Sequence, residues 1–161
     1  GKVRVFDPVA GGEALVVLEG HTGNVNALTA FTDPATGEPR LVSGSCDGWN
    51  VSGNVRVWNP AASSAAIEAE PEGHSDDVGA LVTFVEPATG VLRVATGSND
   101  ETIRVWNAET GGALLVLDVG SNVSALALFV DPATGGPRLA CGSGNKVLVF
   151  DPVAGGEAMV V

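Results

Sequence analysis

Short runs of alternating apolar and polar residues, separated by glycine and proline, dominate the chain. Clear examples are residues 55–58 (VRVW) and 103–106 (IRVW), and neighbouring runs such as 78–84 are rich in β-branched residues. A period of two places successive side chains on opposite faces of a strand, whereas an amphipathic helix needs a spacing of 3.6. Glycine and proline between such runs favour turns. The pattern predicts an all-β chain of short strands.

The same order of segments occurs three times. Each copy has an apolar strand, an acidic residue before Pro-Ala-Thr-Gly, a strand ending in Gly-Ser, and an alternating strand closed by an aromatic residue. The closing residues are Phe6, Trp58, Trp106 and Phe150, at spacings of 52, 48 and 44 residues. A unit of this length holding four antiparallel strands is the size of one β-propeller blade. We expect a half-blade at about 2–20 and blades at about 24–70, 77–118 and 122–161.

The two ends of the chain are near copies of each other. Residues 2–17 and 146–161 are identical at 14 of 16 positions, at an offset of 144 residues, which indicates duplication of a three-blade unit. Closed propellers have about four to eight blades, so three and a half blades predict an incomplete, open propeller. We expect a segment of a longer propeller, or copies that associate through open blade edges. We favour the segment of a longer propeller, because in a simple two-fold assembly both chains would offer the same half-blade and neither would offer the missing first pair of strands.

The net charge and the composition limit the classes of molecule that the chain is expected to bind. With 8 basic and 19 acidic residues the formal net charge is −11, which disfavours nucleic acid and anionic membrane surfaces and favours basic protein surfaces. No apolar run reaches the ~18 residues of a membrane-spanning helix. Cys46 and Cys141 form no ligand motif, so we expect two free thiols, a reducing cytoplasmic compartment, and neither metal nor cofactor.

Recurring polar and aromatic motifs identify a family. Gly-His precedes the first strand of two blades, at residues 20–21 and 73–74; an Asp follows the second strand; and Trp-Asn closes the third, at 58–59 and 106–107. In this combination the chain resembles the WD-repeat family of β-propellers over essentially its whole length, with Asn where the family dipeptide has Asp. The resemblance implies a hydrogen-bonded set pinning each blade. By position these sets are His21, Ser43, Asp47 and Trp58, and His74, Thr96, Asp100 and Trp106.

The three blades match this pattern unequally. Asp100 stands six residues before Trp106, whereas an insertion separates Asp47 from Trp58 by eleven residues, so we expect the first set to be the less secure. The third blade has Gly120-Ser121 in place of Gly-His, Cys141 in place of Ser or Thr, Phe150 in place of Trp, and no Asp. We therefore expect packing alone to hold it.

Catalysis and metal binding are weaker interpretations of the same residues. A Ser-His-Asp set can activate a nucleophile, but here it recurs with Thr96 in place of Ser43 and lacks the Gly-x-Ser-x-Gly elbow. The Asp76-Asp77 pair lacks the alternating ligands of a calcium loop. We therefore expect no enzyme activity.

The resemblance implies recognition through the loops that carry Gly-His and Asp. We expect a non-catalytic scaffold for protein–protein interaction; the alternatives are a structural self-assembling repeat array and a regulatory or sensor domain of a larger protein. Trp49, in the insertion, either anchors a partner or folds over its own blade. The candidate partner-binding residues are Thr22, Asn24, Cys46, Trp49, Ser75, Asp77, Asn99, Ser121 and Asn122.

Overall fold

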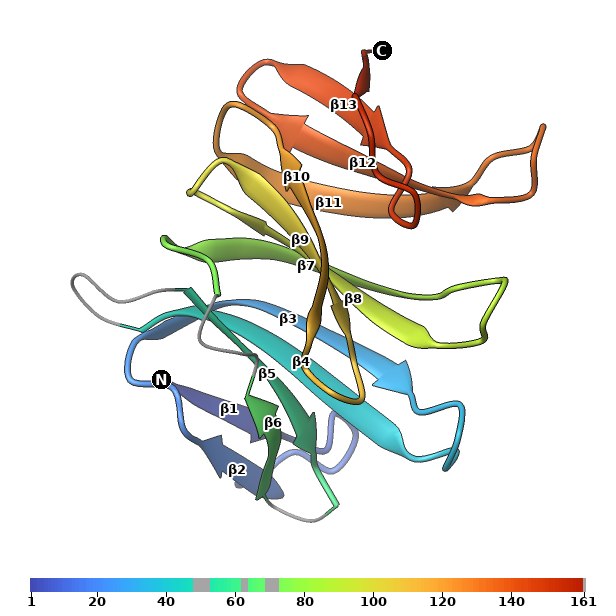
Figure 1. Ribbon diagram of the computed structural model, residues 1–161. Coiled ribbons are helices and arrows are strands. Elements are labelled where there is room, and N and C mark those ends of the chain that lie inside the picture. The colour runs from blue at the N-terminus through green and yellow to red at the C-terminus, as the bar shows by residue number, and fades with distance from the viewer. Residues whose placement is uncertain (48–52, 62–63, 69–72, 161) are drawn as a thin grey trace.

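The computed structural model describes residues 1–47, 53–61, 64–68 and 73–160, and these residues form strands and turns without a helix (Figure 1). No helix able to span a membrane occurs among them. The strands fall into a two-stranded sheet and three four-stranded sheets. The half-blade consists of β1 (Lys2–Val5) and β2 (Val16–Glu19); blade one of β3 (Asn24–Thr32), β4 (Pro39–Cys46), β5 (Gly53–Asn59) and β6 (Ser64–Glu68); blade two of β7 (Val78–Val85), β8 (Leu92–Ser98), β9 (Thr102–Asn107) and β10 (Ala113–Asp118); and blade three of β11 (Val123–Val130), β12 (Pro137–Ser143), β13 (Lys146–Phe150) and β14 (Met159–Val160).

Each sheet is a meander in which chain order and spatial order agree. All neighbouring strands are antiparallel, as in β3-β4-β5-β6. The first strands of the three blades, β3, β7 and β11, lie next to one another. Figure 1 shows the sheets arranged as a fan, with the half-blade at one end and blade three at the other, so the ends do not meet. The prediction of four-stranded propeller blades in an open arrangement is confirmed.

The Pro-Ala-Thr-Gly motif forms the hairpin between the first two strands of every blade. In blade one, the Gly37 N–H donates to the Asp33 carbonyl over 2.8 Å, and the Asp33 carboxylate accepts from the Ala35 N–H. Arg40 forms an ion pair with Asp33 across the base of the turn, at 3.3 Å. Only a residue with positive φ closes this loop, which glycine does without strain. The equivalent glycines have φ of 73° at Gly37, 71° at Gly90 and 70° at Gly135.

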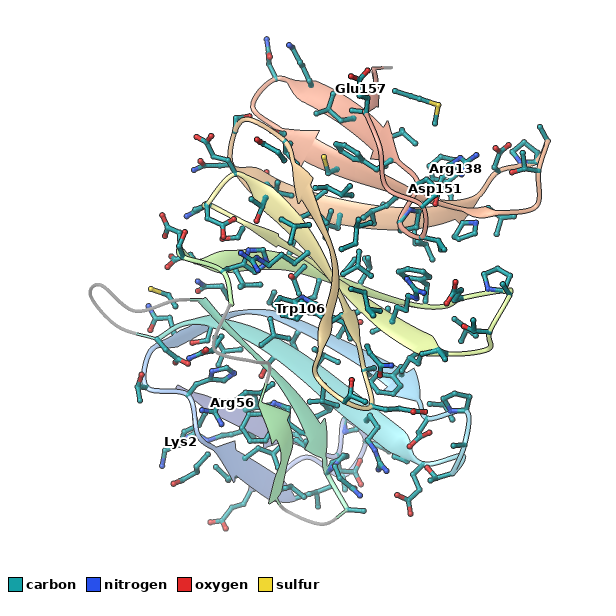
Figure 2. The ribbon with its side chains drawn as sticks, viewed as in Figure 1. Lys2, Arg56, Trp106, Arg138, Asp151 and Glu157 are labelled. Carbon is teal, nitrogen blue, oxygen red and sulfur yellow. The ribbon has the colours of Figure 1, made fainter. Side chains whose placement is uncertain are left out.

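The hydrophobic core lies between the sheets. Val3 and Leu18 of the half-blade pack on Trp58 of blade one. Trp106 of blade two packs against Val42 and the other valines of blade one, and Figure 2 shows it between those two sheets. A third cluster joins blades two and three, and contains Phe84, Ile103, Leu117, Val123, Leu139 and Phe150. Blades one and two therefore each bury one face on the preceding sheet and the other on the following one, whereas blade three buries a face on blade two.

Glycine in the second strand allows the inner strands to approach. A Cβ at Gly44 would lie 2.5 Å from Val78 Cγ1 of the next blade, and a Cβ at Gly97 would meet Val123 Cγ1 as closely. A side chain at either position would push the following blade away, because interiors packed at this density do not absorb an extra methyl group without a shift.

Candidate functional site

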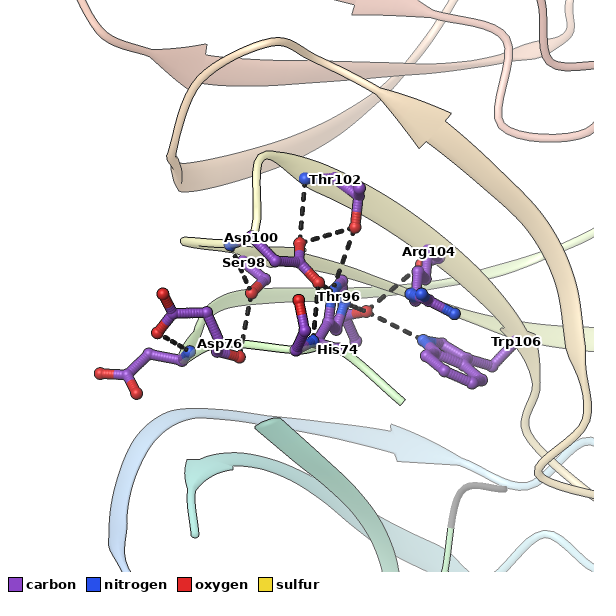
Figure 3. A network of polar contacts seen from close by, with 10 residues as sticks. His74, Asp76, Thr96, Ser98, Asp100, Thr102, Arg104 and Trp106 are labelled. Carbon is purple, nitrogen blue, oxygen red and sulfur yellow. Dashed lines mark hydrogen bonds and ion pairs between the residues drawn. The ribbon is translucent and has the colours of Figure 1, made fainter. Parts of the chain in front are cut away.

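Blade two contains a continuous chain of hydrogen bonds from Trp106 to Asp100 (Figure 3). The indole N–H of Trp106 donates to Thr96 Oγ1 over 2.9 Å, and Thr96 Oγ1 lies 2.6 Å from His74 Nε2. His74 Nδ1 lies 2.9 Å from Asp100 Oδ2. Because an indole can only donate and a carboxylate can only accept, the direction is set: Thr96 donates to Nε2, and His74 donates from Nδ1.

Blade one contains the same chain of contacts in spite of its longer loop. Trp58 Nε1 donates to Ser43 Oγ over 2.7 Å, Ser43 Oγ lies 2.7 Å from His21 Nε2, and His21 Nδ1 lies 3.1 Å from Asp47 Oδ2. The structure thus brings His21, Ser43, Asp47 and Trp58 together as completely as their counterparts in blade two. The lengthened loop separates Asp47 from Trp58 in sequence only.

The aspartates connect two loops of each blade. Asp47 Oδ1 accepts from the backbone N–H groups of Thr22 and Gly23, at 2.7 and 3.0 Å, and from Ser45 Oγ, at 2.8 Å. Its Oδ2 accepts from Asn54 Nδ2 over 2.8 Å. The loop before β3 and the end of β4 are therefore held by one carboxylate. Ser45 and Asn54 were not among the residues predicted from the sequence, although the repeated Gly-Ser pair was a signal for the serine.

Asp100 performs the same task in blade two with a different donor set. It accepts from the Ser75 N–H over 3.0 Å, and from the Thr102 N–H and Thr102 hydroxyl at 3.0 and 2.7 Å. The Asp100 N–H in turn donates to Ser98 Oγ. The loop before β7 and the turn after β8 are thereby joined.

Burial and hydrogen bonding set the protonation states of these groups. Burial opposes ionisation of Asp47, but the hydrogen bonds from the Gly23 N–H, Asn54 and His21 outweigh it and hold its pKa well below the ordinary value. For His21 and His74, burial is the largest influence and lowers the pKa in spite of the neighbouring carboxylates. Both imidazoles are therefore neutral at pH 7, in agreement with the donor directions in the two chains of contacts.

An arginine and a histidine flank each buried indole. His21 meets Trp58 edge-on, with ring centroids 5.9 Å apart, and the Arg56 guanidinium lies 6.0 Å from the Trp58 ring centroid. In blade two the corresponding distances to Trp106 are 6.2 Å for His74 and 5.9 Å for Arg104. Edge-on aromatic contacts and cations over an indole are both attractive. The two arginines were not among the residues predicted from the sequence, although each stands two residues before its Trp and therefore on the same face of the strand.

Blade three lacks the His–Asp chain but is not held by packing alone, so that prediction is wrong. Ser121 Oγ lies 2.5 Å from Ser143 Oγ, and Ser143 Oγ donates to the Ser121 carbonyl over 3.2 Å. Ser143 is the serine of the third Gly-Ser pair. Two short hydroxyl side chains thus join the same two loops, while Cys141 and Phe150 are buried in the positions of the hydroxyl and the indole.

The two loops of each blade lie at the same end of the strands, because the first two strands pair antiparallel. The register places Asn24 opposite Cys46, Val78 opposite Ser98, and Val123 opposite Ser143. The candidate partner-binding residues are accordingly brought to one rim. Trp49 lies outside the described residues. Thr22, Asn24, Ser75, Asn99 and Asn122 are exposed, and Cys46, Asp77 and Ser121 are partly buried.

Acidic side chains occupy the same rim. Asp76 and Glu101 are exposed in the two loops of blade two, and Asp118 is exposed before the first loop of blade three. From the sequence, Asp76 was a candidate only for a calcium loop, and neither Glu101 nor Asp118 was a candidate for any site. In the part of the chain that the structure describes, no group of three or more His, Cys, Asp or Glu side chains is arranged to hold a metal ion.

Comparison with known proteins supports the resemblance that the motifs indicated. The family model described as "WD domain, G-beta repeat" (WD40) matches residues 12–59 and 67–107. THO complex subunit 3 of Arabidopsis thaliana is 35% identical over 95 residues, which are 58% of this chain and 26% of that protein. The chain thus spans about a quarter of that relative's length.

Among solved structures, the crystal structure of the computationally designed Ika4 protein is similar with a TM-score of 0.69 and 29% identity, over 94% of this chain and 79% of that one. The family match covers more than half of the 161 residues, and its two segments contain both His–hydroxyl–Asp–Trp sets. The chain belongs to the WD40 repeat family.

Proposed function

We propose that the chain is a non-catalytic scaffold that binds other proteins through its loop face, defined as residues 20–24, 46–47, 73–77, 99–101 and 118–122. The observation that carries the proposal is the position of Asp47 and Asp100, each of which joins two loops of the face with several hydrogen bonds. Loops held in this way lose little conformational entropy when a partner binds, because they are ordered beforehand.

The charge of the loop face supports a basic partner. Asp76, Glu101 and Asp118 are exposed there, on a chain whose formal net charge is −11. Complementary charge increases the rate of association and discriminates among partners more than it adds affinity. The name of THO complex subunit 3 places that relative in a protein assembly, which agrees with a binding role.

The geometry of the His–hydroxyl–Asp sets supports a structural role for these residues rather than a role in hydrolysis. Ser43 and Thr96 are fully buried, and each accepts an indole N–H while donating to a histidine. A nucleophile must reach a substrate carbonyl, and a hydroxyl oxygen enclosed by Trp and His cannot do so. The repetition of the set in two blades also agrees with a clamp that each blade needs for itself.

Peptide display tests the proposal. The full chain is used to select ligands from a random peptide library, and binding is then measured for two variants of equal charge change. Asp76→Lys with Glu101→Lys alters the loop face, whereas Glu13→Lys with Glu109→Lys alters exposed turns at the opposite ends of the strands. We expect Lys- and Arg-rich ligands whose affinity falls at least tenfold in the first variant only. Failure to enrich any ligand, or equal loss in both variants, would contradict the proposal.

A further inference from the structure

The two near-identical hairpins at the chain ends bury opposite faces. Phe6 is 52% exposed, whereas its counterpart Phe150 is 2% exposed because it packs against blade two. Val147 is 50% exposed, whereas its counterpart Val3 is 4% exposed because it packs on blade one. Each hairpin therefore buries one of its two apolar faces and leaves the other exposed. A single hairpin with neighbours on both sides would satisfy both.

A groove marks the place of a missing strand beside the half-blade. In the described part of the chain β1 pairs only with β2, so the other edge of β1 presents its backbone groups to the groove. The groove has a volume of about 260 Å³ and is lined by Lys2–Arg4 of β1 and Val25–Leu28 of β3. Leu28 is exposed there, whereas the equivalent Leu81 and Leu126 pack against a preceding blade. A free edge of this kind accepts another strand.

The opposite end of the fan presents the complementary surface. Phe129 of β11 is 44% exposed, whereas its counterpart Phe84 in β7 is 5% exposed because blade three covers it. Gly44 and Gly97 each admit a valine of the following blade, namely Val78 and Val123. The third such glycine, Gly142, has no valine against it, and a Cβ there would meet only Ala125, at 3.5 Å. Val25 of blade one is the third such valine.

We propose that two copies of this chain exchange hairpins: β1–β2 of each copy displaces β13–β14 from blade three of the other, and β11 packs on β3. The composite blade keeps the pairing that β12 already makes. Leu139 of β12, which now pairs with Phe150, pairs with Phe6 of the other copy. Ser143, which now pairs with Lys146, pairs with Lys2 of the other copy. Because 14 of the 16 exchanged residues are identical, the exchange preserves almost every contact within the blade.

The gain comes from the surfaces that the exchange covers. Phe129 and Leu28 cover each other when β11 packs on β3. Phe6 takes the site of Phe150 against blade two, so its burial is offset by the release of Phe150, and Val3 stays on blade one. Burial of the newly covered apolar surface opposes the cost of association and of releasing a tail. The expectation that two chains offer only the same half-blade no longer applies, because β11–β12 become available once β13–β14 leave.

The number of blades favours an assembly of two copies. Each copy supplies three blades to the assembly, so two copies form a ring of six, within the range of about four to eight in which propellers close. One copy closing on itself would have three blades and three copies would have nine, both outside that range. Head-to-tail contacts that close in this way form discrete rings rather than fibres.

Disulfide trapping in the full chain tests the exchange. Cys141 is opposite Leu148 in β13, so after exchange it is opposite Arg4 of the other copy. Directly paired strand residues lie within disulfide reach. In a Cys46→Ala background, Arg4→Cys is expected to give a covalent dimer on oxidation, with the introduced thiol linked to Cys141. Leu148→Cys is expected to lock β13 onto β12 within one chain and to give a monomer.

Light scattering during size-exclusion chromatography gives an independent readout. We expect twice the mass of one chain for the wild type, and the mass of one chain for Gly142→Val, whose side chain would collide with Val25 of the other copy. The control is Thr32→Val, since valine stands at the equivalent positions in the other blades, Val85 and Val130. A monomeric wild type, or an Arg4→Cys variant without the interchain disulfide while Leu148→Cys forms its own, would overturn the proposal.

Discussion

The Trp58 indole N–H donates to Ser43 Oγ over 2.7 Å, and both side chains are fully buried. The equivalent contact in blade two joins Trp106 to Thr96 over 2.9 Å. Each hydroxyl thus accepts one hydrogen bond from the indole and donates another to a histidine. That histidine donates in turn to an aspartate carboxylate. Within each Trp–hydroxyl–His–Asp set every one of these donors has an acceptor, so the four side chains can be buried between blades without the cost of unsatisfied polar groups.

Removal of the indole donor in blade two should weaken the fold measurably. Trp106→Phe leaves Thr96 without its donor and is expected to lower the free energy of unfolding by about 1–3 kcal/mol, measured by urea denaturation followed by circular dichroism. In a Thr96→Val background the same substitution should cost less, because the partner is already absent. Strictly additive effects would show that the contact does not stabilise the blade.

Loss of the Asp47 charge should release the loop before β3. Asp47→Asn keeps only one acceptor oxygen, so its NH2 group must face either the Thr22 and Gly23 N–H groups or the donors on His21 and Asn54, and we expect a loss of about 3 kcal/mol or more. The amide hydrogens of those two residues should exchange faster with solvent in the variant. Asp76→Asn, in an exposed loop, should change stability by less than about 0.5 kcal/mol. Similar effects of both substitutions would contradict this role of Asp47.

Stability should fall as the pH decreases below about 6.5. Burial lowers the pKa of His21 and His74 in the folded state, so the unfolded chain binds protons first and is favoured as the pH falls from about 6.5 toward the folded pKa values. A second loss follows below about pH 4, because the hydrogen-bonded Asp47 and Asp100 also have lowered pKa values.

Nuclear magnetic resonance tests the histidine part directly, since the chain has 2 histidines. Their Cε1 proton shifts should show no midpoint near pH 6.5 in the folded protein, and should show one in urea. A normal midpoint in the folded protein would mean that the imidazoles are exposed.

Contact between blades one and two should depend on Gly44. Gly44→Ala places a Cβ 2.5 Å from Val78 Cγ1, and we expect a loss of about 1–3 kcal/mol from the shift that follows. Gly79→Ala is the control, because a Cβ there meets only the Val123 carbonyl, at 3.8 Å. Thermal unfolding of the two variants distinguishes them. Equal melting temperatures would show that the blades separate without cost.

Most of the fold could be predicted from the sequence because the determining signals are local. Alternation with a period of two, the Pro-Ala-Thr-Gly turns and the recurring aromatic residue each act within a few residues, and together they predict strands, hairpins and blade length. The resemblance to the WD-repeat family also implied the members of the two His–hydroxyl–Asp–Trp sets, because the hydroxyl residue and the Asp stand at the same distances from the His in both repeats.

Other features were decided by contacts between distant parts of the chain. The Ser121–Ser143 pair does not follow from any single segment, since it depends on which segments are neighbours in space. The different burial of Phe6 and Phe150 is the clearest case. Their surrounding sequences are nearly identical, so local preference cannot distinguish them. The neighbouring sheet does so, because burial is a property of what lies across the interface rather than of the segment itself.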